Sequence, residues 1–369
     1  MMRSLPRKRW EYFIGPWLVV GVVALVYASI VLAIHDMDPL SFVQLGTRFS
    51  EGDPHGTEGY DGQFAYQIAL NPAGAAPYLD VPAYRYQRIL YSLLARALAL
   101  GRPALIPWTL ILINWLALVA GTRLTEILLQ HYQASRWYAL PYGLYAGQLF
   151  SLRLDVSEPL SQCLVMLGIL WGERKRWPLA ALAFALAGLA KETALLFAAG
   201  YVLYLALKRA WRDAVSVGVI SAGPCIAWQV VLKRWLGQWG LGSGGAGATG
   251  FEWIPFGGIW RIAHYGWEVF ALWLVILGPL LVAPLIVATI ASIRTLMRRP
   301  LHPFPLVLLI NSLALIVLPF STWREMLAIL RLSIGFVASV LLWGAWCRSR
   351  RALVYAQFWI ATLAFLLKE

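Results

Sequence analysis

The chain has 369 residues, of which 60% are hydrophobic and 13% are charged, and its formal net charge is +13. Soluble domains carry roughly 25% charged residues, so this composition excludes an ordinary soluble globular protein. Apolar stretches of about 20 residues recur along the sequence, and each is long enough to cross a hydrocarbon core of ~30 Å. We therefore predict an all-α polytopic membrane protein whose excess basic residues lie in cytoplasmic loops, rather than on a surface that binds nucleic acid.

The first predicted element is an apolar helix from about Phe13 to Ile34. A basic stretch precedes it and no small-residue cleavage site follows it, so we interpret it as a retained transmembrane helix with a cytoplasmic N-terminus. A first extracytoplasmic loop with interfacial helices follows over 35–103. Ten further spans are predicted, over 104–128, 137–153, 157–172, 177–190, 193–207, 213–232, 265–293, 304–320, 327–346 and 352–367. Eleven crossings in a single transmembrane domain over 1–369 place the C-terminus outside.

Residues 85–100 decide how all later loops are oriented. This segment carries Arg85, Arg88 and Arg96, and charge inside a membrane span is costly. Its apolar period suits an amphipathic helix that lies in the outer interface. If it does not cross, 18 of the 31 basic residues fall in short cytoplasmic loops, as the positive-inside rule requires. A crossing would move every later basic cluster outward, so we predict an interfacial helix.

This topology brings four polar segments to the extracytoplasmic face, although their residues play no part in the charge argument. They contain an acid in the first loop, two acids beside a proline, a Lys-Glu pair and a late Arg-Glu-Arg group: Asp61; Asp155 and Glu158; Lys191 and Glu192; Arg324, Glu325 and Arg331. Each segment has a local alternative. Asp155 and Glu158 fit a helix capping box, and the others fit a turn, a polar helix tip or a snorkelling pair.

A glycine-rich segment lies in the predicted extracytoplasmic loop over 236–262. No GK[ST] sequence follows its glycines, which excludes a phosphate-binding P-loop. The segment is therefore either a flexible connection or a mobile lid. The histidines and the three cysteines show no metal-ligand spacing.

The stretch YDGQFAY over 60–66, with the later YRYQRILY, DVSEP, AKETALL and REMLAILR, resembles the GT-C superfamily of membrane glycosyltransferases. It is similar to a bacterial family of GT-C-like proteins with these motifs in the same order, and more distantly to the protein mannosyltransferase and aminoarabinose transferase branch. The similarity covers about residues 55–335. Two departures exist: Gly62 replaces that branch's second acid, and Asp61 lies well past the first helix, whereas Asp36 and Asp38 lie close to it.

The resemblance implies a GT-C-like fold and transfer of a sugar from a polyprenyl-phosphate donor to a glycan, lipid or protein acceptor outside the bacterial cytoplasmic membrane. It implies that Asp61 is the general base, with Asp36 or Asp38 as the alternative. The cations among the binding residues would stabilise the leaving phosphate. Asp-based members of the superfamily differ in metal use, so a divalent metal is an alternative to a metal-free site. The predicted substrate-binding residues are Tyr60, Gln63, Tyr66, Arg85, Arg88, Asp155, Glu158, Lys191, Glu192, Arg324, Glu325 and Arg331.

Two other functions fit a membrane protein of this composition. A transporter or flippase of lipid-linked glycans is expected to show repeat symmetry and ionisable groups near the membrane midplane, and the sequence displays neither. A non-catalytic protein of envelope-polysaccharide assembly would tolerate the loss of Asp61, whereas an enzyme would not. We expect a glycosyltransferase, because the ionisable residues gather at one face.

Overall fold

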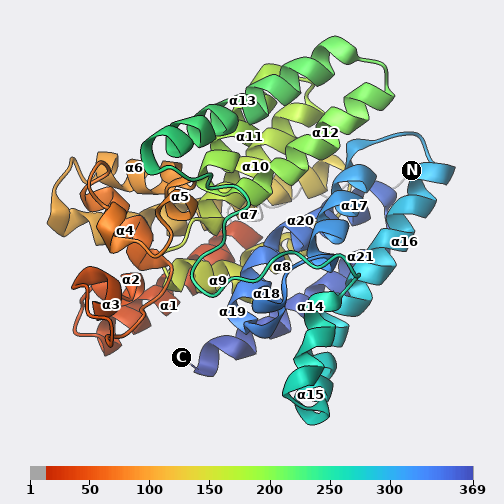
Figure 1. Ribbon diagram of the computed structural model, residues 1–369. Helices are drawn as coiled ribbons and strands as arrows, with labels where there is room; N and C mark the ends of the chain where they lie inside the picture. The colour runs from red at the N-terminus through yellow and green to blue at the C-terminus, as the bar shows by residue number, and fades with distance from the viewer. Residues whose placement is uncertain (1–13, 369) are drawn as a thin grey trace.

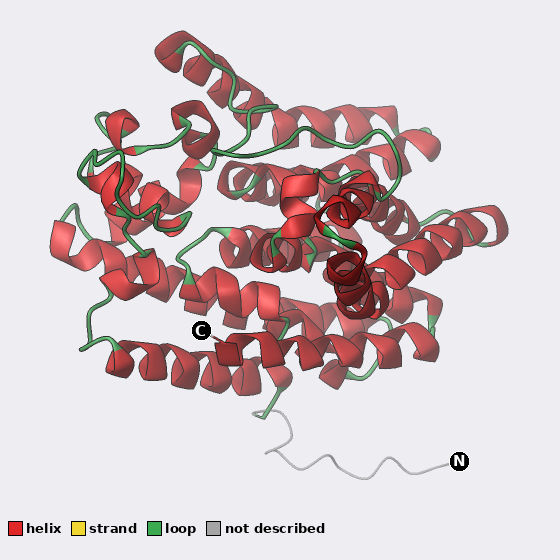
Figure 2. Ribbon diagram, turned by 60° about the horizontal axis from the view of Figure 1, so that its bottom comes forward, coloured by secondary structure: helices red, strands yellow, loops and turns green. Residues whose placement is uncertain are grey.

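The computed structural model describes residues 14–368, so the basic stretch that precedes Ile14 lies outside the described residues. Helices make up 76% of the structure, and the described part of the chain contains no strand (Figure 2). The all-helical class predicted from the sequence is confirmed.

The first helix leads into a polar loop built from short helices. α1 runs over Pro16–Ile34 and carries a proline in its first turn, where a backbone N–H has no partner within the helix. The predicted interfacial helix over 85–100 is two short helices, because the backbone leaves helical geometry at Arg88. The loop helices gather on one side of the structure (Figure 1): α2 (Leu40–Val43), α3 (Thr47–Ser50), α4 (Gly62–Leu70), η2 (Ala76–Tyr78), α5 (Pro82–Tyr86) and α6 (Ile89–Leu98).

The long helix α7 (Ile106–His131) follows one 3₁₀ turn, η3 (Pro103–Leu105), and packs against α1, α6 and α10. Asn114 lies buried within it, and its Nδ2 donates to the Tyr91 hydroxyl at 2.7 Å and to the Val156 carbonyl at 3.1 Å. These bonds connect α7 to α6 and to the segment that precedes α10.

The predicted span over 137–153 is not one helix. Tyr145 adopts extended geometry, with φ −66° and ψ 130°, and so ends the helical hydrogen-bonding pattern. All residues of the last piece are buried, so other helices enclose this segment. The three pieces are η4 (Arg136–Ala139), α8 (Leu140–Gly143) and α9 (Ala146–Arg153).

Four helices and one short turn then form a packed group. α11 buries six alanines and Gly188 among others, and such small side chains let neighbouring helices approach closely. α11 contacts α10, α12 and α13. The elements of this group are α10 (Glu158–Glu173), α11 (Trp177–Ala190), η5 (Glu192–Ala194), α12 (Leu195–Leu207) and α13 (Trp211–Leu236).

The connection after α13 crosses from beside α5 and α6 to α14 (Figure 1). α15 projects away from the body of the structure and continues into α16 through a π-helical turn (Figure 1). The elements of this part are α14 (Gly257–Trp260), η6 (Arg261–Tyr265), α15 (Trp267–Leu277), η7 (Gly278–Val282), α16 (Ala283–Arg298) and α17 (Pro303–Ile316).

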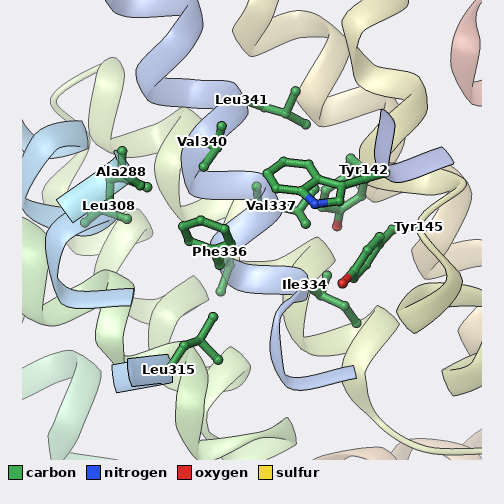
Figure 3. Close-up of a cluster of buried hydrophobic side chains, with 14 of the residues drawn as sticks. Tyr142, Tyr145, Ala288, Leu308, Leu315, Ile334, Phe336, Val337, Val340 and Leu341 are labelled. Atoms are coloured by element: carbon green, nitrogen blue, oxygen red, sulfur yellow. The ribbon is translucent and has the colours of Figure 1, made fainter. Parts of the chain in front are cut away.

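The C-terminal helices fill the centre of the main hydrophobic core. Buried side chains of α20 meet Leu308 and Leu315 of α17, Ala288 of α16, and Tyr142 and Tyr145 from the broken segment (Figure 3). The C-terminal elements are α18 (Phe320–Arg324), α19 (Met326–Leu332), α20 (Ile334–Cys347), α21 (Arg350–Gln357) and η8 (Phe358–Lys368).

Five helical segments among the described residues are long and apolar enough to cross a membrane. Large apolar side chains on α1, α13 and α15 are exposed, as expected where a helix faces lipid. The chain is therefore described as a helical membrane protein. The five segments are Pro16–Ile34, Pro103–His131, Trp211–Leu236, Trp267–Arg298 and Met326–Trp346.

Candidate functional site

Asp61 lies at the start of α4, where two glycines shape the backbone. Gly59 has a φ of +65°, which residues other than glycine rarely adopt. A Cβ added to Gly62 would lie 2.2 Å from the carbonyl oxygen of Leu154. The YDGQF turn therefore packs directly against the segment that leads into α10.

The Asp61 carboxylate binds two arginines from distant parts of the chain. Its Oδ1 accepts a hydrogen bond from Arg85 Nη1 at 2.8 Å, and its Oδ2 accepts one from Arg331 Nη2 at 3.0 Å. The Asp61 side chain is 28% exposed, whereas both arginine side chains are below 10%. The carboxylate thus joins the polar loop to α19 and stays accessible to a small molecule.

Arg85 is held in place by Asp80 and Phe64 as well as by Asp61. Asp80 accepts from its Nε and its Nη2, each at 2.7 Å, in a two-point contact. The guanidinium carbon lies 4.1 Å from the centre of the Phe64 ring, in cation–π contact. Asp80 also accepts from the amide of Ala246 at 2.9 Å, so the glycine-rich loop contacts the same group of residues.

Arg331 connects Asp61 to a buried ion pair. Its Nη1 lies 3.8 Å from Glu158 Oε1, and the same oxygen accepts from Lys191 Nζ at 2.6 Å. The guanidinium also lies 5.1 Å from the centre of the Tyr60 ring. Residues of the polar loop, α10, α19 and the α11–η5 turn therefore meet in one continuous network.

Arg88 forms a second two-point contact at the edge of this network. Its Nη2 and Nε donate to the two carboxylate oxygens of Glu192, at 2.7 and 3.0 Å. Its Nη2 also donates to the Tyr84 hydroxyl at 2.8 Å. Asp61 and Glu158 thus join Arg85, Arg331 and Lys191, and Arg88 lies beside them because it lines the same cavity as Arg85 and Arg331.

The arginines keep the acids of the polar loop ionised. Burial raises the pKa of Asp61, but the charges of Arg85 and Arg331 lower it by more, so this pKa lies well below its usual range. Burial also opposes ionisation of Asp80, and the hydrogen bond from Arg85 outweighs it and lowers that pKa. Both groups are carboxylates at neutral pH.

Two cavities meet at Asp61. The smaller has a volume of about 40 Å³ and is lined by Asp61, Arg85, Arg88, Glu158 and Arg331, among others. It has room for about three water-sized groups. The larger has a volume of about 190 Å³, and its lining includes Phe49, Glu58, Tyr60, Asp61, Gln63, Phe64, Arg85 and Glu325. Asp61, Phe64 and Arg85 are shared and form the wall between the cavities.

The three other predicted residues of the YDGQF region have different positions. Tyr60 lines the larger cavity, and its hydroxyl donates to Glu325 Oε1 at 2.6 Å. Gln63 lines it too, but its amide group holds the loop together, since it accepts from the Gly46 amide and donates to the Glu58 carbonyl. Tyr66 lines neither cavity and packs among apolar side chains of α6 and α7.

The expected pairing of Arg324 with Glu325 is absent among residues 14–368. Arg324 is exposed and lies 5.5 Å from the centre of the Phe320 ring. Glu325 instead contacts Tyr60, because the backbone between α18 and α19 is extended at Glu325 and directs the neighbouring side chains apart.

The capping box that was the local alternative for Asp155 and Glu158 is absent from the structure. Ser157 occupies the N-cap position of α10, and Glu158 is the first helical residue and pairs with Lys191. Asp155 has a φ of +46° and is fully buried, with no hydrogen-bond partner for either carboxylate oxygen among the described residues. Burial raises the pKa of Asp155 well above the usual range and outweighs the charge of Arg153, so burial favours the neutral form of this side chain.

The alternative acids near the first helix lie apart from these cavities. Asp36 and Asp38 are both exposed and line neither cavity. Asp38 Oδ1 accepts from the Leu40 amide at 2.9 Å, which is a local turn contact. The geometry therefore favours Asp61 over these two residues as the acid of the site.

The acids at Asp61 are separated by cations rather than gathered around a shared point. No group of three His, Cys, Asp or Glu side chains suited to a metal ion occurs in the described part of the chain. Asp61, Asp80, Glu158 and Glu192 each accept hydrogen bonds from an arginine or lysine. The divalent metal named as an alternative does not fit this arrangement of side chains.

Several residues of the site were missed in the sequence. Asp80 and Tyr84 fix Arg85 and Arg88, and Phe64 stacks on Arg85. The signal was present, because Asp80 lies five residues before Arg85 and Tyr84 lies four residues before Arg88, in and beside short helices.

Comparison with models of known protein families, with curated proteins and with solved structures finds no match to this chain.

Proposed function

We propose that the protein is a membrane glycosyltransferase that moves a sugar from a polyprenyl-phosphate donor to an acceptor on the extracytoplasmic side of the bacterial cytoplasmic membrane. A GT-C-like fold with about eleven crossings, and with α5 and α6 in the outer interface, would present the site to that side. One observation carries the proposal: Asp61, a partly exposed carboxylate, lies between two cavities and binds two arginines.

The smaller cavity suits the phosphate of the donor. Arg85, Arg88 and Arg331 line it, and guanidinium groups bind phosphate through charge-assisted hydrogen bonds. The same groups would stabilise the charge that develops on the phosphate as its bond to the sugar breaks. A phosphate must compete with Asp61 and Glu192 for these arginines, so binding would rearrange the network.

The larger cavity suits the sugar and the acceptor. Tyr60 and Phe49 offer apolar ring faces, and Glu58 and Glu325 offer carboxylate oxygens that accept hydrogen bonds from hydroxyl groups. Asp61 reaches this cavity as well as the smaller one.

The competition for arginines also explains how Asp61 acts as a base. In the resting structure its pKa is too low for efficient proton transfer, since a general base works best near the operating pH. A phosphate that draws Arg85 and Arg331 away would raise the pKa of Asp61. The acceptor oxygen then bonds to the anomeric carbon, the bond from that carbon to the phosphate oxygen breaks, and the acceptor proton passes to Asp61.

The test measures both sugar transfer and lipid binding in a single variant. Asp61→Asn keeps the size of the side chain and removes the base, so transfer of sugar from a polyprenyl-phosphate sugar should fall by about 10²–10⁴-fold. Binding of polyprenyl phosphate, measured by native mass spectrometry, should be tighter, because Arg85 and Arg331 each lose one of two carboxylate partners. Asp36→Asn and Asp38→Asn are matched controls and should leave both measurements unchanged.

Three outcomes would contradict the proposal. Full transfer by Asp61→Asn would exclude Asp61 as the base. Loss of transfer in Asp36→Asn or Asp38→Asn would move the base to the end of α1. Movement of the intact lipid-linked sugar across vesicle membranes, without transfer, would identify a flippase.

A further inference from the structure

A separate cavity lies at the opposite end of the bundle from Asp61. It has a volume of about 290 Å³ and is lined by the turn after α7, the end of α20 and the start of α21, including Gln133, Ser135, Arg348 and Arg350. α7 separates the two ends, since its N-terminal part contacts Tyr91 and its C-terminal end precedes this turn. A helix of 26 residues is about 39 Å long.

The positive charge at this cavity is not neutralised by carboxylates. Arg348 donates to Gln133 Oε1 at 2.8 Å, a neutral acceptor. Neither Arg348 nor Arg350 forms an ion pair with an acid of residues 14–368. Arg299 adds a third charge nearby, since its Nη1 donates to the Cys347 carbonyl. Arg85, Arg88 and Arg331 at the other end each have an acidic partner, so the contrast marks this cavity as a site for an anion.

Apolar side chains also line the cavity and its flanks. Ala345 and Leu353 line it and are almost fully buried. Outside it, Trp137 is 42% exposed, and Val354 and Phe358 are 51% and 45% exposed. A partly exposed tryptophan is typical of the membrane–water interface. A ligand in this cavity would contact arginines at one end and apolar side chains at the other.

We propose that this cavity binds the phosphate group of an anionic phospholipid. Arg348 and Arg350 would bind the phosphate oxygens, and the Ser135 hydroxyl would donate to the headgroup. The acyl chains would lie along the exposed side chains Val354 and Phe358. Basic pockets at the ends of transmembrane helices recognise acidic headgroups in this way. The apolar flank favours a lipid over a soluble phosphate compound.

The experiment measures binding of phosphatidylglycerol to the full-length protein in detergent by native mass spectrometry. Arg348→Gln with Arg350→Gln should weaken binding by about tenfold or more, the effect expected for lost charged hydrogen bonds. Lys208→Gln with Arg209→Gln is the matched control: it removes two exposed charges, one from a left-handed position like that of Arg348. It should change binding less than twofold. Ser135→Trp should weaken binding as well, because it fills the cavity mouth and keeps every charge.

Specific results would overturn this assignment. Equal weakening by the two double variants would show diffuse attraction to basic loops. Equal binding of phosphatidylcholine and phosphatidylglycerol would exclude recognition of net charge. Displacement of the lipid by an equal concentration of glycerol 3-phosphate would identify a soluble phosphate ligand instead. Unchanged binding in Ser135→Trp, which leaves the arginines intact, would exclude the cavity even if the arginine variants fail to fold.

Discussion

Glu158 and Lys191 form the least exposed ion pair of the candidate site, with 4% and 7% of their side chains exposed. Removal of one partner from a buried pair leaves the other charge uncompensated and costs about 3–5 kcal/mol. We expect Lys191→Ala to lower the free energy of unfolding by about this amount. Lys191→Met combined with Glu158→Gln should restore most of it, because both charges are then absent. Thermal unfolding in detergent measures both, and equal stability of the two variants would show that charge is not the cause.

Asp155 predicts a dependence of stability on pH. Its pKa is raised in the folded chain, whereas an unfolded Asp titrates near pH 3.9. The folded chain therefore binds this proton more tightly, and its stabilising effect is complete below about pH 4 and is lost as pH rises through the folded pKa.

Asp155→Asn should remove this dependence. Each pKa unit of elevation costs about 1.4 kcal/mol once the pH exceeds the folded pKa, and a neutral amide avoids that cost. We expect the variant to unfold at a higher temperature than the native chain at pH 8, and with a smaller difference between pH 5 and pH 8. A lower melting temperature at pH 8 would show that Asp155 works as a charged group.

The sequence indicated which residues belong to one face but not how they pair. The distribution of basic residues over short loops predicts a topology that places one set of charged residues at the same face. The structure joins these residues in one network: Asp61, Glu158, Lys191 and Arg331. The capping box failed because local spacing cannot reveal that Lys191, 33 residues later, competes for Glu158. The contact of Tyr60 with Glu325 spans 265 residues and leaves no local signal.

At the level of elements, α4 is positioned by a single close approach. The Cβ of an alanine at position 62 would lie 2.2 Å from the Leu154 carbonyl oxygen, so the backbone must move. We expect Gly62→Ala to destabilise the protein by about 1–3 kcal/mol and to lower transfer by about 10²-fold, because Asp61 shifts with the start of the helix.

Gly218→Ala provides the control for that substitution. Gly218 lies inside α13, and an added Cβ would lie 3.7 and 4.0 Å from the Val202 methyl groups, in ordinary van der Waals contact. Alanine favours helix over glycine by about 0.8–1.0 kcal/mol, so this variant should be slightly more stable and fully active. Native stability and activity in Gly62→Ala would show that the contact with Leu154 does not set the position of Asp61.

The sequence predicted where the long helices lie more accurately than how the short segments are built. α1, α7, α13 and α20 fall within the predicted spans or extend them by a few residues, because continuous apolar runs determine them. The segment over 137–153 is less apolar than these helices and contains Pro141 and Gly143, and because it is enclosed by protein it does not need one continuous helix. Hydropathy reports burial and cannot distinguish lipid from a protein interior.

At the scale of the whole molecule, the prediction concerns the orientation of the chain in the membrane. We expect the loop after Arg176 to be cytoplasmic and the end at Glu369 to be extracytoplasmic, because 85–100 does not cross. Reporter fusions at these two positions, one active only in the cytoplasm and one only outside, measure each side. A cytoplasmic signal at Glu369 would contradict the predicted odd number of crossings. It would also remove the argument that the charged segments lie at one face of the membrane.

The ion network can form completely only late in the synthesis of the chain. Asp61 leaves the ribosome 270 residues before Arg331, its last partner. Until α19 has been made and inserted, Asp61 and Glu158 lack one of their cations. The charges of the network can be balanced only when the chain is nearly complete, so in a stalled or truncated nascent chain Asp61 and Glu158 can each have one cation, Arg85 and Lys191, instead of two.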